Sequence, residues 1–312
     1  MLPRCLQVVA DIGVADALGD TPKTAAALAA ATGANAQALG RALRLLAANG
    51  VFGYRDGHFH HTAASQLLRA DHPQSVRPVV RLWGLAGFWK VISELDYSIR
   101  TGLPADNKAL SGGLWGYLSG DAEASRVFDE AMTAKAYAQV PGVVSAYDFS
   151  NFRTIGDIGG GRGHLLKAIL ASAPDAKGVL FEQPHVIQAA SSIKSDRLSL
   201  QAGDFFKDHL PVCDAYLLME VIHDWDDEHS RKILERVHAA APVLAKVLII
   251  EQMIVDDVGP SWPRTLDIWM LAISGKQRTR QEYAALLTAG GFRFLREIDT
   301  HAGVSIIEGI RA

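Results

Sequence analysis

The spacing of apolar residues along the chain changes near Arg153. From there on, short apolar runs rich in β-branched residues alternate with segments whose apolar positions recur at helical spacing. Such alternation predicts an α/β fold, a Rossmann-like, doubly wound parallel sheet covered by helices. The expected strands are "TIGDIG" (154–159), "KGVLFE" (177–182), "LSLQAGD" (198–204), "AYLLMEVI" (215–222) and "KVLIIEQMI" (246–254). The expected helices are residues 164–173, 185–193, 227–241 and 279–290.

The first 64 residues follow a different plan. An amphipathic helix opens the chain, and a second helix is expected with Thr21 as its N-cap, Pro22 in its first turn and Gly33 as its stop. A third helix closes at Gly50, and two short strands flank an Asp56-Gly57 turn. Helices followed by such a hairpin predict a mostly helical winged-helix domain.

Residues 65–146 are expected to be helical, so the chain divides into residues 1–64, a helical linker and pocket region at 65–146, and the α/β domain at 147–312. The middle region is dense in aromatic residues. They suit core packing, and together they also suit a pocket for a flat aromatic ligand. They are Trp83, Phe88, Trp89, Tyr97, Trp115, Tyr117, Phe128 and Tyr137.

Charge argues against nucleic acid as a partner. The chain of 312 residues has a net charge of -3, and residues 1–62 hold five basic and four acidic residues. A winged helix that reads DNA needs a basic recognition helix to neutralise phosphates. The apolar helix found here favours packing against another protein chain.

The composition also limits location and metal chemistry. The only cysteines, Cys5 and Cys213, form no CxxC pair, which excludes a cysteine-rich zinc site and favours a reducing cytoplasm. No apolar window approaches the length of a membrane span, and Asp11 and Asp16 interrupt the apolar N-terminus. We expect a cytoplasmic protein without a metal site.

Glycines follow the first expected strand in "IGDIGGGRGHLL", with the spacing Gly159-x-Gly161-x-Gly163. A glycine-rich turn between a strand and a helix usually admits a ligand. The dinucleotide fingerprint is G-x-G-x-x-G, and a P-loop requires Lys and Ser or Thr after its last glycine, where this chain has His164 and Leu165. Neither motif matches.

Acidic residues end the next two strands. Glu182 can accept both hydroxyls of a ribose, a geometry shared by dinucleotides and S-adenosylmethionine. Asp204 can accept the amino proton of adenine, and Phe205 can pack on the adenine face. These features on successive strand ends predict a nucleoside-containing ligand.

Four segments carry a family resemblance. "DIGGGRGHLL", "FEQPHV", "GDFF" and "HDWDDEHSRKIL" resemble the S-adenosylmethionine-dependent O-methyltransferases of the plant caffeic acid type and their bacterial antibiotic- and phenazine-tailoring relatives. The resemblance covers nearly the whole chain. It implies that the loop from Asp157 through Gly163 cradles the methionine part of S-adenosylmethionine. It also implies that the winged helix is a dimerisation domain of a homodimer, with a shorter first segment than relatives carry.

Methyl transfer to a hydroxyl needs a base, for which histidine is well suited. His223 follows the fourth strand and matches the family's catalytic base, and the resemblance gives Glu251 the role of holding its imidazole. Gln277 stands where the family commonly has a second acid. We therefore expect His223 to be less basic than in such relatives, or the acceptor hydroxyl to be already acidic.

The resemblance also assigns contacts to the remaining site residues. Trp225 is expected near the adenine, and Met219 is expected to contact the cofactor through its backbone or by apolar packing. A small phenolic or heteroaromatic acceptor is expected against one group of side chains. They are Met132, Asp267, Trp269 and Met270.

Alternatives stay open at this stage. The same fold and cofactor serve an N-methyltransferase or a relative that binds the cofactor without methylating, although a ring nitrogen would not require a base. A winged-helix DNA-binding regulator is disfavoured by charge, and an NAD-dependent oxidoreductase by the glycine spacing.

Overall fold

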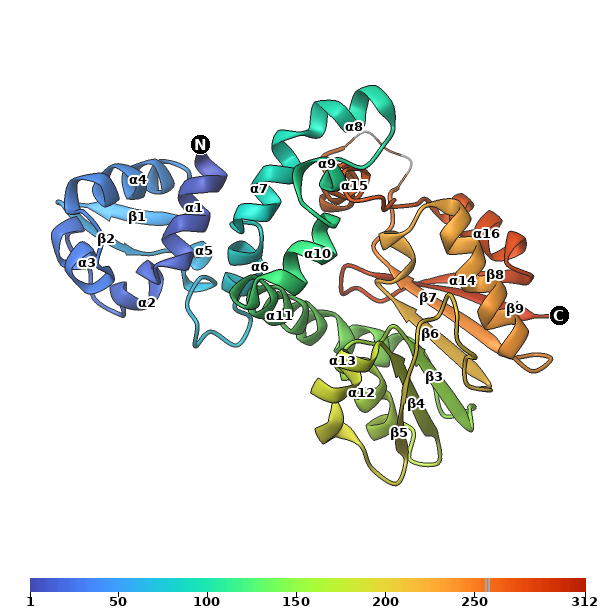
Figure 1. The fold of residues 1–312 in the computed structure, drawn as a ribbon. Helices are drawn as coiled ribbons and strands as arrows, with labels where there is room; N and C mark the ends of the chain where they lie inside the picture. The colour runs from blue at the N-terminus through green and yellow to red at the C-terminus, as the bar shows by residue number, and fades with distance from the viewer. Residues whose placement is uncertain (256, 258) are drawn as a thin grey trace. The chain divides into compact units, whose positions relative to one another are not determined.

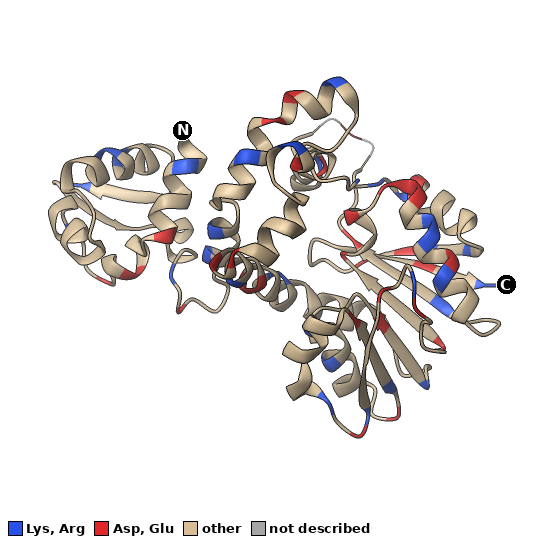
Figure 2. Ribbon diagram, in the orientation of Figure 1, with Lys and Arg blue, Asp and Glu red and all other residues tan. Residues whose placement is uncertain are grey.

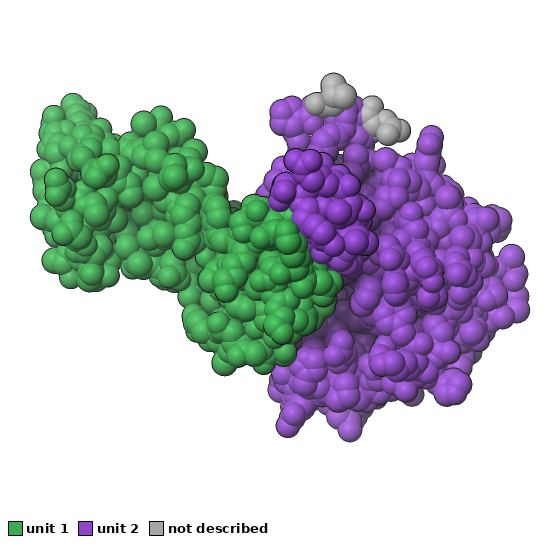
Figure 3. All heavy atoms as spheres, turned by 45° about the horizontal axis from the view of Figure 1, so that its top comes forward, with its two compact units in different colours: residues 1–94, 106–135 green, residues 95–105, 136–312 purple. Residues whose placement is uncertain are grey.

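The structure is a computed structural model that describes residues 1–255, 257 and 259–312. It forms two compact units, residues 1–94 with 106–135 and residues 95–105 with 136–312 (Figure 3). The boundary at residue 135 falls within one long helix, α11 (Ala122–Ala146). Each unit has its own apolar core.

The first unit begins with helices and a hairpin. These are α1 (Leu2–Asp11), α2 (Val14–Leu18), α3 (Ala25–Thr32), α4 (Ala36–Ala48), β1 (Phe52–Arg55) and β2 (His58–His61). Asp56 and Gly57 both have positive φ, 49° and 79°, as the tight turn of a two-residue hairpin requires. The winged-helix prediction is confirmed. Basic and acidic residues are interspersed along the ribbon of this unit (Figure 2).

The expected start of the second helix at Thr21 is wrong. Helix α3 begins at Ala25, and Thr24 caps it by accepting a hydrogen bond from the Ala27 amide at 3.2 Å. Lys23 exchanges two backbone hydrogen bonds with Phe59 of the hairpin, at 3.0 and 2.8 Å. This bridge keeps the preceding segment extended, and Thr24 is the first residue free to cap.

Further helices complete the first unit. They are α5 (Ala63–Gln66), α6 (Arg77–Leu82), α7 (Ala86–Ser93), α9 (Asp106–Ala109), α10 (Gly113–Gly120) and residues 122–135 of α11, while α8 (Leu95–Thr101) belongs to the second unit. Arg81 on α6 pairs with Asp11 at 3.0 Å, and with Glu123 and Glu130 at 3.2 and 3.3 Å. One guanidinium thus connects α1, α6 and α11.

The second unit is built on a seven-stranded sheet in the order β5-β4-β3-β6-β7-β9-β8 (Figure 1). The strands are β3 (Thr154–Ile158), β4 (Lys177–Glu182), β5 (Leu198–Ala202), β6 (Ala215–Met219), β7 (Lys246–Glu251), β8 (Phe292–Asp299) and β9 (Ser305–Arg311). The first five are parallel, as predicted. Strand β9 pairs antiparallel with both β7 and β8.

Helices cover both faces of this sheet, which explains why its strands are almost continuously apolar. Helices α14 (Asp227–Ala240) and α16 (Arg280–Ala289) pack on one face. Helices α12 (His164–Ser172) and α13 (Pro184–Ala189) pack on the other, with the end of α11. Helix α15 (Trp262–Ala272) contacts α8. Among the helices of the described residues, none combines the length and apolarity needed to cross a bilayer.

A buried tyrosine hydroxyl fixes the turn that enters β6. The Tyr216 hydroxyl donates to the carbonyl of Pro211 at 2.8 Å and accepts from the amide of Cys213 at 3.0 Å. Tyr216 is fully buried. The Cys213 amide is buried, so this donor depends on the hydroxyl for its partner.

We expect Tyr216→Phe to lower the free energy of unfolding by about 1–3 kcal/mol, since it leaves the buried Cys213 amide without a hydrogen-bond partner. Urea unfolding measures this change. The matched control is Tyr137→Phe, because Tyr137 is 69% exposed. Equal stability of the two variants would contradict the prediction.

Candidate active site

The glycine loop connects β3 to α12 at the carboxyl edge of the sheet. Gly159 has φ of 70°, and a Cβ there would lie 3.0 Å from the Val221 side chain, beside Phe205. Gly161 has φ of 57°, and nothing lies within 4 Å of where its Cβ would be. Gly163 caps α12. The loop is thus closed toward the protein and open over Gly161.

Two carboxylates lie under this loop. Asp157 is buried, and neither of its oxygens has a hydrogen-bond partner among the described residues. Burial, and next the charge of Glu182, raises the pKa of Asp157 to about 7. Glu182 ends β4 and accepts the Gly161 amide at 3.2 Å. Two of the predicted acids therefore share one electrostatic environment.

Aromatic rings gather after β5. Asp204 accepts the Phe206 amide at 2.9 Å and pairs with Lys207 at 2.9 Å, and these hydrogen bonds, that of Lys207 first, hold its pKa below the usual value. Trp225 meets Phe206 and Phe205 edge to face, with ring centroids 4.7 and 6.0 Å apart. The sequence predicted Phe205 and Trp225 but missed Phe206, the second aromatic residue of "GDFF".

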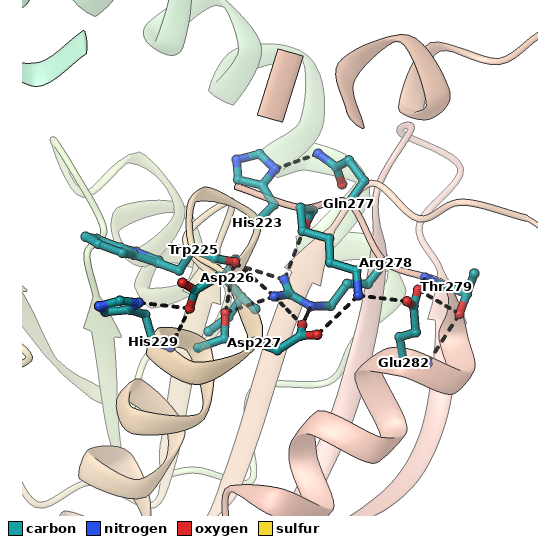
Figure 4. A network of polar contacts seen from close by, with 12 residues as sticks. His223, Trp225, Asp226, Asp227, His229, Gln277, Arg278, Thr279 and Glu282 are labelled. Atoms are coloured by element: carbon teal, nitrogen blue, oxygen red, sulfur yellow. Dashed lines mark hydrogen bonds and ion pairs between the residues drawn. The ribbon is translucent and has the colours of Figure 1, made fainter. Parts of the chain in front are cut away.

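His223 lies in a short 3₁₀ turn, Ile222–Asp224, directly after β6, and only 4% of it is exposed. Its Nδ1 atom is 2.8 Å from Gln277 Nε2 (Figure 4). The same atom is 3.2 Å from Glu251 Oε2. Its backbone amide donates to Glu251 Oε1 at 3.2 Å. The structure therefore brings the three predicted catalytic residues together.

The field at this cluster is dominated by acids. Burial, and next the charge of Glu220, raises the pKa of Glu251 well above its usual range, and Arg278 opposes this. Asp224 Oδ1 lies 3.5 Å from Nε2, the outer nitrogen of His223. Acidic side chains therefore lie beside both ring nitrogens of His223.

Glu220 is a residue that the sequence reasoning missed. It follows Met219 at the end of β6 and has φ of 52°, a strained value for a non-glycine residue. Its Oε1 accepts from Gln252 at 2.9 Å and from Gln139 at 3.4 Å. A carboxylate at a strand end was the signal used for Glu182, and it would have found Glu220. Met219 itself packs on the apolar core between the sheet and α12.

The expected acceptor residues fall in both units. On α15, Asp267 accepts a hydrogen bond from the backbone amide of Gln277 at 2.8 Å. Trp269 and Met270 on the same helix are buried. A Cβ at Gly275 would lie 2.4 Å from the His223 carbonyl and 2.9 Å from Met270 Sδ, so Met270 lies beside the histidine turn. Met132, half-buried on α11, belongs to the first unit.

Arg278 was missed altogether. It is fully buried and binds the segment that carries His223, as Figure 4 shows. A charged residue next to an expected catalytic residue gave no sign of burial in the sequence. Among the described residues, no group of three or more His, Cys, Asp or Glu side chains could hold a metal ion.

Two family models match this chain. The O-methyltransferase domain matches residues 93–293, and the O-methyltransferase dimerisation domain matches residues 1–71. The recognised resemblance and the dimerisation assignment of the N-terminal region are thus confirmed.

Similar proteins cover almost the full chain. The phenazine O-methyltransferase of Lysobacter antibioticus is 40% identical, over 98% of this chain and 91% of its own. The mitomycin biosynthesis 6-O-methyltransferase of Streptomyces lavendulae is 36% identical, over 99% and 91%. An 8-amino-8-demethylriboflavin N,N-dimethyltransferase of Streptomyces davaonensis is 34% identical, over 92% and 85%.

A similar solved structure contains the cofactor. It is an O-methyltransferase from neocarzinostatin biosynthesis in complex with S-adenosylmethionine and 2-hydroxy-5-methyl naphthoic acid. It is 31% identical, with a TM-score of 0.85 over 99% of this chain and 96% of that one. The chain therefore belongs to the O-methyltransferase family, and it is a methyltransferase that uses S-adenosylmethionine.

Proposed function

We propose that this enzyme methylates a hydroxyl of a small aromatic metabolite, with His223 as the general base. The observation that carries the proposal is the buried cluster of His223, Glu251 and Gln277 beside the glycine loop. S-adenosylmethionine supplies an electrophilic methyl group on a sulfonium. As the acceptor oxygen bonds that methyl and the sulfur–carbon bond breaks, the hydroxyl proton goes to His223 Nε2.

The residues at the glycine loop fit the cofactor. Gly161 offers an open backbone surface, and Glu182 offers carboxylate oxygens to ribose hydroxyls. Asp157 has two buried oxygens in need of donors, which a cofactor with N–H and O–H groups provides. Trp225 and Phe205 supply apolar faces for the adenine. Each of these groups therefore suits a different part of the cofactor.

The imidazole can act as a base at Nε2 only if Nδ1 carries the proton. Nδ1–H then needs an acceptor, and the Gln277 carboxamide supplies one when it turns by 180°. Its Oε1 is buried and lacks a partner among the described residues, so this rotation satisfies both groups. Glu251 Oε2 lies 3.2 Å from the same nitrogen, where its charge can act on the ring.

Glu251 stabilises the product of the proton transfer. Burial makes its charged form unfavourable on its own, as its raised pKa indicates. A proton that arrives on His223 creates a cation beside it and offsets that penalty. The pair therefore favours an imidazolium at the moment when the hydroxyl has lost its proton.

The acceptor contacts within the second unit are expected from α15. Trp269 and Met270 present apolar surface, and Asp267 can accept a hydrogen bond from a polar substituent. Flat, adaptable side chains suit a planar ring. The relatives named for phenazine and the neighbour bound to a naphthoic acid support an aromatic acceptor.

We also propose that the enzyme is a homodimer. Residues 1–71 match the family's dimerisation domain. Apolar side chains stay exposed on two helices there, Val8 on α1 and Leu45 on α4. A second copy of the chain would cover them.

Glu182→Gln should weaken binding of S-adenosylhomocysteine about 10- to 100-fold, because charge-assisted hydrogen bonds to the ribose are lost. Isothermal titration with S-adenosylmethionine, S-adenosylhomocysteine and NAD measures this. NAD should not bind. Unchanged affinity in the variant, or preference for NAD, would remove the cofactor assignment.

His223→Ala should lower kcat about 10²- to 10⁴-fold on a hydroxyl acceptor found by screening phenols and hydroxynaphthoic acids. Affinity for S-adenosylhomocysteine should change less than about twofold, because no cofactor contact is assigned to the imidazole. The control is His58→Ala, an exposed position in the N-terminal hairpin. A variant that keeps full activity on that hydroxyl acceptor would overturn the assignment of His223 as its general base.

Gln277→Glu should make His223 more basic, because it adds a carboxylate next to Nδ1. The acidic limb of kcat/KM against pH should then move to higher pH, since the base loses its proton only at higher pH. Rate profiles of both enzymes with one phenolic acceptor test this. A superimposable profile would exclude electrostatic tuning by this position.

A further inference from the structure

The carbonyl groups on both sides of His223 are held by one side chain. Arg278 Nη1 donates to the carbonyl of Ile222 at 3.2 Å, and Nη2 donates to the carbonyl of Trp225 at 2.9 Å (Figure 4). These two carbonyls bracket the turn that presents the histidine. The residue before Arg278 is Gln277, whose side chain contacts the imidazole itself.

The guanidinium is itself fixed from several sides. Asp227 Oδ1 accepts from Nε at 2.9 Å and lies 2.8 Å from Nη2. Ser230 Oγ accepts from Nη2 at 3.2 Å and donates to the carbonyls of Ile222 and Trp225 at 3.2 and 3.3 Å. The Tyr283 ring lies 6.0 Å away. The planar cation is therefore locked before any ligand binds.

We propose that Arg278 is a positioning residue that clamps the turn carrying His223 and Trp225, so that the base and the aromatic side of the cofactor site form one rigid unit. The proposal rests on the proposed role of His223 as base. It extends that role, because one residue that touches neither cofactor nor acceptor sets the geometry of both.

Arginine is the side chain that this position requires. A guanidinium presents donors in a fixed fork, which reaches the two carbonyls and the Asp227 carboxylate at once. A lysine ammonium is a compact point charge on a flexible stem and cannot span these acceptors together. Because Arg278 and its hydrogen bond to the Ile222 carbonyl are buried, loss of this donor leaves a buried acceptor unpaired.

The charge of Arg278 acts on Glu251 as well. The groups that face Glu251 are His223, the carboxylates Glu220 and Asp224, the phenol of Tyr283, and Arg278. Arg278 is the cation that works against burial and the two acids. Without Arg278, ionisation of Glu251 requires a higher pH. Because the ionised Glu251 stabilises the imidazolium, the acidic limb of the rate profile then moves to higher pH.

The variants Arg278→Lys and Arg278→Met separate the fork from the charge. Both should speed amide hydrogen exchange of residues 222–226 about tenfold and weaken S-adenosylhomocysteine binding severalfold. Both should lower kcat per S-adenosylhomocysteine-binding site about 10- to 100-fold with a phenolic acceptor. Only Arg278→Met should move the acidic limb, because lysine keeps the charge.

Two further variants guard against simple unfolding. Asp227→Asn removes the charge of the more exposed partner of Arg278. It should speed amide exchange, weaken S-adenosylhomocysteine binding and lower kcat, each by less than the Arg278 variants do. The matched control is Arg197→Lys, whose guanidinium donates to the carbonyls of Ala173 and Ala176 in the turn before β4. It should leave exchange of residues 222–226 and kcat within about twofold.

The proposal is wrong if the Arg278 variants lose only thermal stability. In that case the amide exchange of residues 222–226 and kcat per S-adenosylhomocysteine-binding site would both be unchanged. Exchange and S-adenosylhomocysteine binding need neither acceptor nor base. If His223→Ala retains activity, the base assignment fails, and the exchange data still decide whether Arg278 holds the turn.

Discussion

The parallel pairing of β3 with β4 and β6, and of β6 with β7, is the constraint on which this site depends. Parallel strands open their carboxyl ends on one edge of the sheet, so residues far apart in sequence meet there. The residues at the carboxyl ends of these strands are Asp157, Glu182, Met219 and Glu251, and His223 lies in the 3₁₀ turn after β6. The strand order reverses between the neighbouring strands β3 and β6, because the chain returns from the edge strand β5 to the middle of the sheet, and this leaves the carboxyl edge open to a ligand at that point.

The same arrangement buries charge beside the reacting groups. Asp157 and Glu251 have raised pKa values, because each carboxylate lies at a strand end beneath a covering loop or turn. Such carboxylates are costly in the free protein and become favourable when a donor or a cation reaches them. The cofactor and an imidazolium are the two species that the mechanism brings there. Binding and proton transfer thus relieve a penalty that the fold creates.

Local patterns predicted the five parallel strands, the hairpin turn and the residues at strand ends, because apolar runs and turn residues act over short distances. Tertiary contacts decided the rest. The bridge between Lys23 and Phe59 moved the helix cap to Thr24. Strands β8 and β9 have no such alternation with helices and were not predicted. Arg278 resembles any surface arginine in sequence, and only the segments that surround it show that it is buried.

The order of strands also bears on how the chain folds during synthesis. Strand β7 needs β9 as its antiparallel neighbour, but β9 is made only after α15, α16 and β8. Until then the apolar edge of "KVLIIE" has no partner on that side, and an unpaired edge of this kind invites association with other chains. Because a pairing between such distant segments closes late, this edge of the sheet stays unpaired until Ile306 and Ile307 enter the core.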